Sequence, residues 1–314
     1  MSQKIGVIGG GTMGHGIAAA FALGGCPAIL YEPAESQRAA ILPAIRDAYA
    51  LLVEEGIATA AAVVAAETRL HLTDDLSAAV ADRDFIVEAI PERLDLKQAL
   101  FADLDVRAPA DAVLASNTSS LPLAAMMETV SAARRERMLV THWYNPPLIM
   151  PLVELSLFGN MPEPVYDRVA KLHASIGKRT VKVLKDVPGL IANRIQQAIA
   201  REVFSIIEQG IAAPEDVDRA LKFGPAFRYA TTGQLEVADF GGLDIWAAVG
   251  DNLLAVMDAS KAASPLLKQK VAEGKLGVKS GEGFYRYSPD TVGEVRRAFL
   301  KRLIHQLKAS RAYG

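Results

Sequence analysis

The chain has 314 residues, of which 51% are apolar and 22% are charged, and its formal net charge at pH 7 is −2. This length accommodates two domains with cores of their own, and the composition is that of a globular protein. The near-neutral charge gives no electrostatic reason to expect nucleic acid or an anionic membrane as a partner. Cys26 is the only cysteine, which excludes an intrachain disulfide and a cysteine metal cluster.

The N-terminal segment MSQKIGVIGGG lacks the charged stretch and long apolar segment of a signal peptide. No uncharged run of the sequence reaches the length of a membrane span. We therefore expect a cytoplasmic protein without a membrane partner.

The first half of the chain alternates short β-branched runs with alanine-rich helical stretches. The expected strands are Lys4–Ile8, Ala28–Tyr31, Phe85–Glu88, Ala112–Ala115, Met138–His142 and Thr180–Leu184. Helices are expected to begin near Met13, Glu35, Leu94 and Val165, and residues 35–68 hold two helices where a minimal unit has one. This alternation predicts an α/β fold with a doubly wound parallel sheet.

The strand pattern ends at the turn sequence Asp186-Val187-Pro188-Gly189. We place the domain boundary there, which gives domains of residues 1–187 and 188–314. Leu190–Gln209 predicts one long helix, and further helices follow with turns near Gly224-Pro225, Gly241-Gly242 and Gly281–Gly283. The second domain is therefore expected to be all-α.

The last predicted helix, Glu294–Lys308, carries apolar residues at helical spacing beside basic ones. A basic amphipathic helix can lie on a membrane surface. It can also pack on its own domain or on a partner subunit with its charges in solvent. The low net charge of the chain favours the packed helix.

The sequence IGVIGGGTMGHGIA contains Gly9-x-Gly11-x-x-Gly14 directly after the first expected strand and at the start of a helix. In a dinucleotide-binding turn, the first glycine makes the tight turn, the second admits the pyrophosphate and the third allows close helix packing. The pyrophosphate then lies against free amide groups at the helix N-terminus. With Thr12 and Met13 between its last two glycines, the segment predicts a cofactor-binding turn.

Glu32 stands at the end of the second expected strand, where an acidic residue meets the adenosine ribose hydroxyls of a dinucleotide. A carboxylate at this place repels a 2′-phosphate, so NAD is favoured over NADP. Alternatively, Glu32 is a solvated loop residue, but its position between an apolar strand and a helix favours the binding role.

Six segments resemble the 3-hydroxyacyl-CoA dehydrogenase family, in the same order, over about residues 4–287. They are GGGTMG, PERLDLK, SNTSSLP, THWYNPPLIMPLVEL, VPGLIANR and KSGEGFYRY. The resemblance implies a Rossmann domain that binds NAD, a helical C-terminal domain used for homodimerisation, and hydride transfer between NAD and a β-hydroxyl group.

The resemblance also implies roles for individual residues. His142 matches the catalytic histidine and Glu154 the acidic residue that pairs with it, while Ser119 and Asn193 match the residues that bind the substrate oxygen. The residues that match cofactor-binding positions outside the glycine turn and Glu32 are Glu92, Lys97, Asn117, Asn145 and Lys279.

The chemistry of the reaction agrees with these roles. An imidazole suits the proton transfer that accompanies oxidation of a secondary alcohol, and a carboxylate on its far nitrogen holds the correct tautomer. Hydroxyl and amide groups such as those of Ser119 and Asn193 can bind the oxygen as its charge changes. Since the nicotinamide accepts the hydride, no metal is needed.

Each of these residues also has a structural alternative. His142 could be a core histidine, Ser119 a helix N-cap, Asn193 a packing residue and Lys279 a surface residue. The remaining histidines lack comparable neighbours in the sequence and are interpreted as structural or surface residues: His15, His71, His173 and His305.

Two departures from the acyl-CoA pattern concern the substrate. Members that act on CoA esters tend to have a lysine-rich helix after the second strand, whereas this chain offers Arg46 followed by Glu54 and Glu55. Residues 224–244 form a longer loop in which Arg228-Tyr229 resembles the L-gulonate 3-dehydrogenase and lambda-crystallin branch. Arg228 could bind a free carboxylate or be a solvated loop arginine.

Four hypotheses follow, in order of preference. The first is an NAD-dependent dehydrogenase of a free 3-hydroxy acid, and the second a 3-hydroxybutyryl-CoA type of dehydrogenase. The third is a non-catalytic, crystallin-like protein, which the presence of His142 and Glu154 disfavours. The fourth is an aromatic-aldehyde dehydrogenase in which Trp143 and Tyr144 line a pocket for a planar substrate, unless both are core residues.

Overall fold

The computed structural model describes residues 3–313. The chain divides into two compact units, Met1–Ile191 and Ala192–Gly314. The first unit ends slightly later than the expected boundary because the backbone amides of Gly189 and Ile191 hydrogen bond to Ser119 and Glu154 within that unit.

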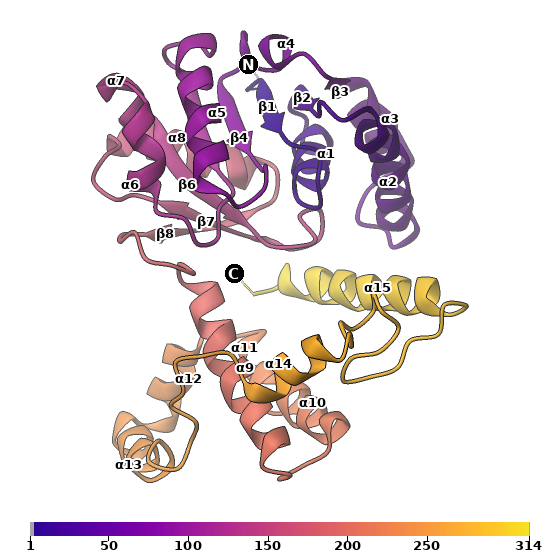
Figure 1. The fold of residues 1–314 in the computed structure, drawn as a ribbon, viewed down its shortest axis with the longest axis vertical. Coiled ribbons are helices and arrows are strands. Elements are labelled where there is room, and N and C mark those ends of the chain that lie inside the picture. Colours follow the sequence, from indigo (N-terminus) through magenta and orange to yellow (C-terminus); the bar gives the residue numbers. More distant parts are fainter. Residues whose placement is uncertain (1–2, 314) are drawn as a thin grey trace. The chain divides into compact units, whose positions relative to one another are not determined.

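An eight-stranded sheet forms the centre of the first unit (Figure 1), in the order β3-β2-β1-β4-β5-β6-β7-β8. The strands are β1 (Ile5–Ile8), β2 (Ala28–Tyr31), β3 (Leu70–Thr73), β4 (Phe85–Glu88), β5 (Val113–Ser116), β6 (Met138–Trp143), β7 (Leu152–Ser156) and β8 (Arg179–Val183). All neighbours pair in parallel except β6 and β7, which are antiparallel. The predicted Rossmann-type doubly wound sheet is confirmed, with one unpredicted antiparallel pair.

The strand order reverses direction at β1. Helix α1 (Gly14–Leu23) leads outward to β2, α2 (Glu35–Glu54) and α3 (Ala60–Arg69) lead on to β3, and α4 (Leu76–Val80) returns to β4 on the other side of β1. At such a switch point the carboxyl ends of the two central strands border a crevice that binds ligands. The fold therefore places the ends of β1 and β4, and the residues that follow them, at the expected cofactor site.

Two strands were missed in the sequence, β3 and β7. The run LHLT of β3 is short and follows a helix directly, while in β7 the charged Glu154 interrupts the apolar pattern. Glu154 lies within β7, opposite His142 in the register of β6. A buried strand accepts this carboxylate because its partner on the neighbouring strand hydrogen bonds to it.

The remaining helices of the first unit cover the sheet and connect its later strands. They are α5 (Leu94–Arg107), α6 (Leu123–Met126), the 3-10 helix η1 (Met127–Thr129), α7 (Ala132–Arg135) and α8 (Glu163–Ser175). A core cluster joins α5, α6, β4, β5 and β6 through residues such as Phe101, Leu104, Leu114 and Leu123.

His173 of α8 lies in the core of the first unit, fully buried against the rings of Phe21, Phe85 and Trp143. Its Nδ1 lies 2.8 Å from the carbonyl oxygen of Val169, and desolvation by burial lowers the pKa of His173 to about 4. The interpretation of this histidine as structural agrees with its place.

We expect the first unit to lose stability as the pH falls from about 6.5 towards 4. The unfolded chain binds a proton at His173 near its ordinary pKa of 6.5, whereas the folded chain excludes it until about pH 4, so protonation favours unfolding in this window. The difference corresponds to about 3 kcal/mol at the acid end of the window. Urea unfolding at pH 7 and pH 4.5 measures it, and His173→Phe should lose less stability than the wild type between the two pH values. An equal loss in both proteins would contradict the assignment to His173.

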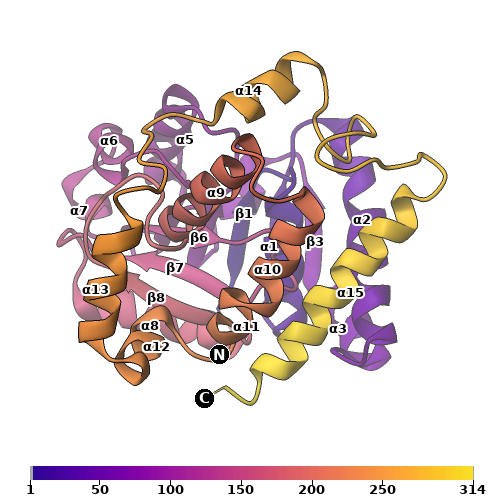
Figure 2. The same ribbon diagram turned by 90° about the horizontal axis from the view of Figure 1, so that it is seen from below.

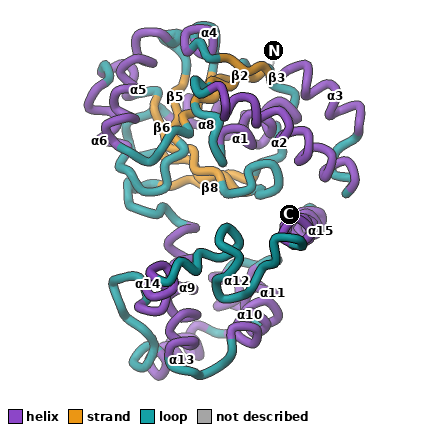
Figure 3. The backbone as a smooth tube through the Cα atoms, turned by 45° about the vertical axis from the view of Figure 1, so that its right-hand side comes forward, coloured by secondary structure: helices purple, strands orange, loops and turns teal. Residues whose placement is uncertain are grey.

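The second unit is helical, as predicted, and Figure 3 shows no strand in its described part, residues 192–313. Its helices are α9 (Ala192–Glu208), α10 (Pro214–Phe223), α11 (Pro225–Tyr229), α12 (Gln234–Gly241), α13 (Leu243–Leu253), α14 (Pro265–Ala272) and α15 (Val292–Ser310), labelled in Figure 2. The expected loop of residues 224–244 is instead formed by α11, α12 and the start of α13. The helices are separate because α11 begins with a proline and α12 is flanked by glycines at both ends.

The terminal helix α15 extends slightly further at both ends than predicted. Its buried residue is Ile304, while the apolar residues Val295 and Phe299 are 39% and 49% exposed. Among residues 3–313, no helix is long and apolar enough to cross a membrane.

Candidate active site

The glycine turn connects β1 to α1 and has the geometry that a dinucleotide needs. Gly9 has φ +99°, a conformation that favours glycine, and a Cβ on Gly14 would lie 1.7 Å from the carbonyl oxygen of Gly9. The third glycine is therefore required by the turn itself rather than by the sheet. A Cβ on Gly11 would meet nothing within 4 Å, so the backbone there borders open space.

These residues fit NAD. The open space at Gly11 lies beside Thr12 and Met13, before the first turn of α1, where backbone N–H groups lack intrahelical acceptors. At the end of β2 the Glu32 carboxylate accepts bonds from the N–H groups of Gly10 (2.9 Å) and Ala34 (3.0 Å). The acidic side chain is thus held beside the turn, as recognition of a ribose requires.

A buried ion pair stands at the carboxyl end of β4. Glu88 has no exposed side-chain surface, and its Oε1 lies 2.6 Å from Nζ of Lys97, while Ser116 Oγ donates to its Oε2 over 2.6 Å. Burial raises the pKa of the Glu88 carboxyl, and the Lys97 ammonium opposes this shift. Glu88 was not among the residues predicted from the sequence, although a glutamate at the end of an apolar strand is a recognisable signal.

Lys97 also contacts Glu92, with 3.3 Å between Nζ and Oε2. Although burial acts to raise it, hydrogen bonds from Thr118 and the charge of Lys97 hold the pKa of Glu92 below its usual range. Oε1 of Glu92 accepts bonds from the hydroxyls of Thr118 and Ser120 and from the N–H groups of Ser119 and Ser120. Lys97, which was expected at the cofactor, is 1% exposed and supports the loop that follows β5.

The loop after β5 carries two of the predicted residues. Asn117 accepts a hydrogen bond from the N–H of Trp143 through its Oδ1, at 2.9 Å. Ser119 does not cap a helix, because α6 begins at Leu123 and its N-cap residue is Pro122. The partly buried Ser119 therefore lies in a loop between the ends of β5 and α6, held by Glu92.

His142 and Glu154 form a hydrogen-bonded pair across the antiparallel strands β6 and β7. Nδ1 of His142 lies 2.7 Å from Oε2 of Glu154, and the two residues are directly opposite in register. Both are buried. Because Nδ1 is engaged with the carboxylate, Nε2 is the ring nitrogen left for a substrate.

The two aromatic residues that follow His142 lie on different sides of β6. The ring of Tyr144 stands edge-on to His142 with the centroids 5.1 Å apart, and burial together with the Glu154 charge raises the pKa of Tyr144 to about 12. Trp143 points the other way into the core and is 1% exposed, so it does not line a site beside His142.

The other predicted residues lie elsewhere in the chain. Asn145 is exposed in the turn that follows β6. Asn193 at the start of α9, Arg228 on α11 and Lys279 in the bridged turn of residues 277–286 belong to the second unit. The structure thus joins His142 to Glu154 and Glu92 to Lys97 and Ser119. Among residues 3–313, no group of three or more His, Cys, Asp or Glu side chains could hold a metal ion.

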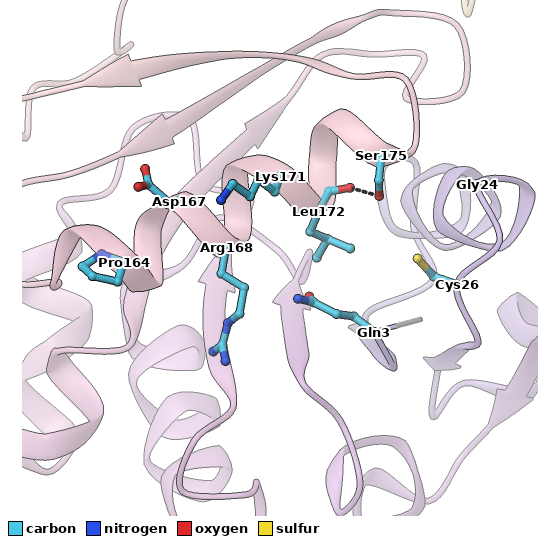
Figure 4. Close-up of a pocket in the computed structure, with 9 residues that line it drawn as sticks. All are labelled: Gln3, Gly24, Cys26, Pro164, Asp167, Arg168, Lys171, Leu172 and Ser175. Carbon is cyan, nitrogen blue, oxygen red and sulfur yellow. Dashed lines mark hydrogen bonds between the residues drawn. The ribbon is translucent and has the colours of Figure 1, made fainter. Parts of the chain in front are cut away.

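A cavity of about 590 Å³ lies at the opposite ends of the strands (Figure 4). It is lined by residues of α8, among them Asp167, Arg168 and Lys171, and by Gln3 and Cys26. It contains none of the predicted site residues, and Gln3 precedes β1 while the glycine turn follows that strand. The cavity is therefore separate from the candidate active site.

The fold and the cofactor turn define the class of this protein as an NAD-dependent dehydrogenase acting on a CH–OH group. Residues 4–187 match the family described as 3-hydroxyacyl-CoA dehydrogenase, NAD binding domain, and residues 189–287 match the corresponding C-terminal domain. The chain belongs to the 3-hydroxyacyl-CoA dehydrogenase family, as the sequence motifs predicted.

Relatives of this chain act on different kinds of substrate. The 5-formyl-3-hydroxy-2-methylpyridine 4-carboxylate 5-dehydrogenase of Mesorhizobium japonicum is 33% identical over 306 residues, 97% of each chain. The L-carnitine dehydrogenase of Streptomyces griseus is 35% identical over 74% of this chain and 68% of its own. The 3-hydroxybutyryl-CoA dehydrogenase of Mycobacterium tuberculosis is 33% identical over 91% and 98%.

A solved structure extends the first of these similarities. It is that of a 5-formyl-3-hydroxy-2-methylpyridine 4-carboxylic acid 5-dehydrogenase, an NAD⁺-dependent dismutase, with a TM-score of 0.91, 31% identity and full coverage of both chains. The M. tuberculosis protein FadB2 gives a TM-score of 0.76 over 91% of this chain and 99% of its own.

Proposed function

We propose that this protein oxidises a CH–OH group of a substrate with a free carboxylate, using His142 and Glu154 as its acid–base pair. The observation that carries the proposal is the 2.7 Å contact between His142 Nδ1 and Glu154 Oε2, with both residues buried. A carboxylate in this place fixes the tautomer whose Nε2 can accept a proton, and it stabilises the imidazolium that results.

NAD, when bound, supplies the hydride acceptor for the reaction. In the proposed mechanism the substrate hydroxyl gives its proton to Nε2 of His142. Ser119 and Asn193 bind the substrate oxygen as it becomes a carbonyl. These two assignments come from the family resemblance, and for Ser119 the loop geometry around Glu92 adds a reason for its fixed position.

The cofactor contacts are proposed for the glycine turn with Thr12 and Met13, for Glu32, and for Asn117, Asn145, Glu92 and Lys279. Lys97 is assigned a supporting role, since its ammonium lies between the carboxylates of Glu88 and Glu92. We therefore expect Lys97 to act on the cofactor site through the loop that Glu92 holds.

The charges of α2 favour a free acid over a CoA ester. The basic residues of this helix are Arg38 and Arg46. Arg38 pairs with Asp74 (3.0 Å) and Arg46 with Glu67 (3.0 Å), so both positive charges of α2 already have carboxylate partners. The phosphates of CoA would have to displace these carboxylates. Two relatives are named for carnitine and for a pyridine carboxylate, and both of these compounds carry a free carboxylate.

A second candidate substrate is the hydrated aldehyde of an aromatic acid, whose CH–OH group resembles that of an alcohol. Two observations favour it: the Tyr144 ring beside His142 offers an aromatic face or edge, and the pyridine-carboxylate relative matches nearly the whole chain. Trp143, which was considered as a second aromatic wall, is in the core and takes no part.

Steady-state rates with matched substrates test the proposal. We expect kcat/KM for the preferred free acid, among 3-hydroxybutyrate, carnitine and 5-formyl-3-hydroxy-2-methylpyridine 4-carboxylate, to exceed that for 3-hydroxybutyryl-CoA. Arg228→Ala should raise KM for the acid about 10- to 100-fold, the loss expected for one charged hydrogen bond. Lys222→Ala, which removes an exposed cation from the preceding helix α10, is the control. A preference for the thioester would reject the free-acid assignment.

We further propose that the protein is a homodimer through its second unit. Large apolar side chains are exposed along α12 and α13 and the segment that follows, a pattern typical of protein interfaces: Leu235, Phe240, Leu243, Ile245, Leu253, Leu254 and Val256. Light scattering should give twice the chain mass of 33.6 kDa, and Phe240→Asp should lower it to one chain. A monomeric wild type would contradict this proposal.

A further inference from the structure

The segment Gly189–Ile191, which joins the two units, is hydrogen-bonded to two of the proposed catalytic residues. The backbone N–H of Ile191 donates to Oε1 of Glu154 over 2.9 Å. The backbone N–H of Gly189 donates to the carbonyl oxygen of Ser119 over 3.1 Å. One short stretch of backbone therefore contacts both the carboxylate of the acid–base pair and the loop that carries the serine.

Leu190, between these two amides, has an unusual backbone conformation. Its φ is +48°, in the left-handed region that residues with a Cβ rarely adopt. Its side chain is 6% exposed and belongs to the same core cluster as Leu123 and Val183. Such a conformation persists where the surroundings dictate it, and it is frequent at functional sites. Here the buried side chain and the two flanking hydrogen bonds dictate it together.

The residues that precede Leu190 also anchor the segment, through a turn and a hydrogen bond to α6. The N–H of Leu190 donates to the carbonyl oxygen of Val187 over 3.2 Å, which closes a turn with Pro188 and Gly189 at its centre. Gly189 has φ +80°, as the second central residue of a type II turn requires. The carboxylate of Asp186 accepts a bond from the N–H of Ala124. The segment is thus anchored on both sides of Leu190.

The bond from Ile191 bears directly on the orientation of His142. One oxygen of Glu154 contacts His142 and the other contacts Ile191, so the two bonds fix the rotation of the carboxylate. The side chain of Glu154 is fully buried, and the neighbouring Tyr144, whose pKa is raised to about 12, stays neutral at ordinary pH. Loss of the Ile191 bond removes one of the contacts that hold the carboxylate, and we expect it to weaken the contact with the imidazole.

We infer that Gly189–Ile191 is a positioning segment for the reaction, in which the Ile191 amide orients Glu154 and the Gly189 amide orients the Ser119 loop. The inference rests on the proposed function, because it assumes that His142 and Glu154 are the acid–base pair. It adds to that function a requirement for two backbone N–H groups, those of Gly189 and Ile191.

The pair Ile191→Pro and Ile191→Ala tests the inference. Proline removes the N–H donor, and the position directly precedes α9, so that no hydrogen bond within the helix is lost. Alanine keeps the donor and removes a side chain that is 42% exposed. Two quantities are measured: kcat with NAD, and the downfield proton NMR signal of the His142 Nδ1–H in the protein without substrate, which His142→Gln assigns by its disappearance.

We expect Ile191→Pro to lower kcat about 10- to 100-fold, the range for a small misplacement of a catalytic group, and to shift or broaden the NMR signal. KM for NAD should stay within about twofold, since the glycine turn is untouched. Ile191→Ala should leave kcat and the signal close to the wild type. An unchanged kcat and an unchanged signal in a folded Ile191→Pro protein would overturn the inference.

If circular dichroism shows that Ile191→Pro does not fold, Leu190→Gly takes its place. Glycine adopts φ +48° without strain but lacks the buried side chain, so the segment loses its anchor while keeping both amides. A signal and kcat equal to the wild type in Leu190→Gly would also overturn the inference. A separate result tests the proposed function: full activity of His142→Gln would reject it. In that case the NMR comparison would still show whether the segment orients the pair.

Discussion

His142→Gln is expected to lower kcat about 10³- to 10⁴-fold, because the substrate proton then has no base to receive it. Glutamine can still donate and accept hydrogen bonds, so the site should remain formed. NAD binding should change by less than about twofold, since the glycine turn follows β1 and Glu32 follows β2, away from β6, which carries His142. Stopped-flow or steady-state measurement of NADH formation gives kcat, and fluorescence titration gives the dissociation constant of NAD.

Glu154→Gln separates the role of the carboxylate from that of the imidazole. The neutral amide no longer stabilises the imidazolium and can favour the wrong tautomer, so we expect a loss of roughly 10²-fold or more in kcat. His71→Gln, at an exposed position of β3, is the matched histidine control and should match the wild type. Near-normal turnover of His142→Gln would remove the acid–base assignment altogether.

Lys97→Met is expected to destabilise the first unit by about 3–5 kcal/mol, because it leaves the fully buried Glu88 carboxylate without its cation. The loss should grow as the pH rises above the ordinary pKa of a carboxyl group, because the unfolded chain ionises Glu88 freely there, whereas burial raises the pKa of this carboxyl in the folded chain. The same change releases Glu92 and with it the loop of Thr118–Ser120, so KM for NAD should rise as well. Urea unfolding followed by circular dichroism measures the stability.

Lys4→Met provides the contrast for this prediction. Lys4 pairs with Asp82 at 2.5 Å, as close as the buried pair, but the two side chains are 46% and 71% exposed. An exposed ion pair contributes no more than about 1 kcal/mol. The double change Glu88→Gln/Lys97→Met should recover part of the stability lost in Lys97→Met. If Lys4→Met and Lys97→Met destabilise equally, the buried pair has no special role.

The cofactor turn is the part of the site that local sequence predicted in most detail. A strand, three glycines, a helix and an acidic residue at the next strand end follow one another within residues 4–32, and the interactions that form the turn are short in range. The backbone conformation of Gly9 and the open space at Gly11 are direct consequences of residue type. Such features need little information from the rest of the chain.

Strands β3 and β7 were not predicted from the sequence, because they depend on contacts with distant parts of the chain. Neither β3 nor β7 has a clear alternating pattern, and each exists because a neighbouring strand supplies its hydrogen bonds. The starts of helices α1, α2 and α5 were predicted to within one residue.

The sequence by itself determined the class of fold, the NAD turn and, through the family motifs, the identity of His142 and Glu154 as candidates. Only the tertiary structure decided that these two stand opposite each other on antiparallel strands, that Trp143 belongs to the core, and that Lys97 is buried against Glu88. The physical reason is that burial and pairing of a polar side chain depend on what the fold brings against it. Glu88 and Lys97 are nine positions apart in the sequence, and this spacing permits their contact without requiring it.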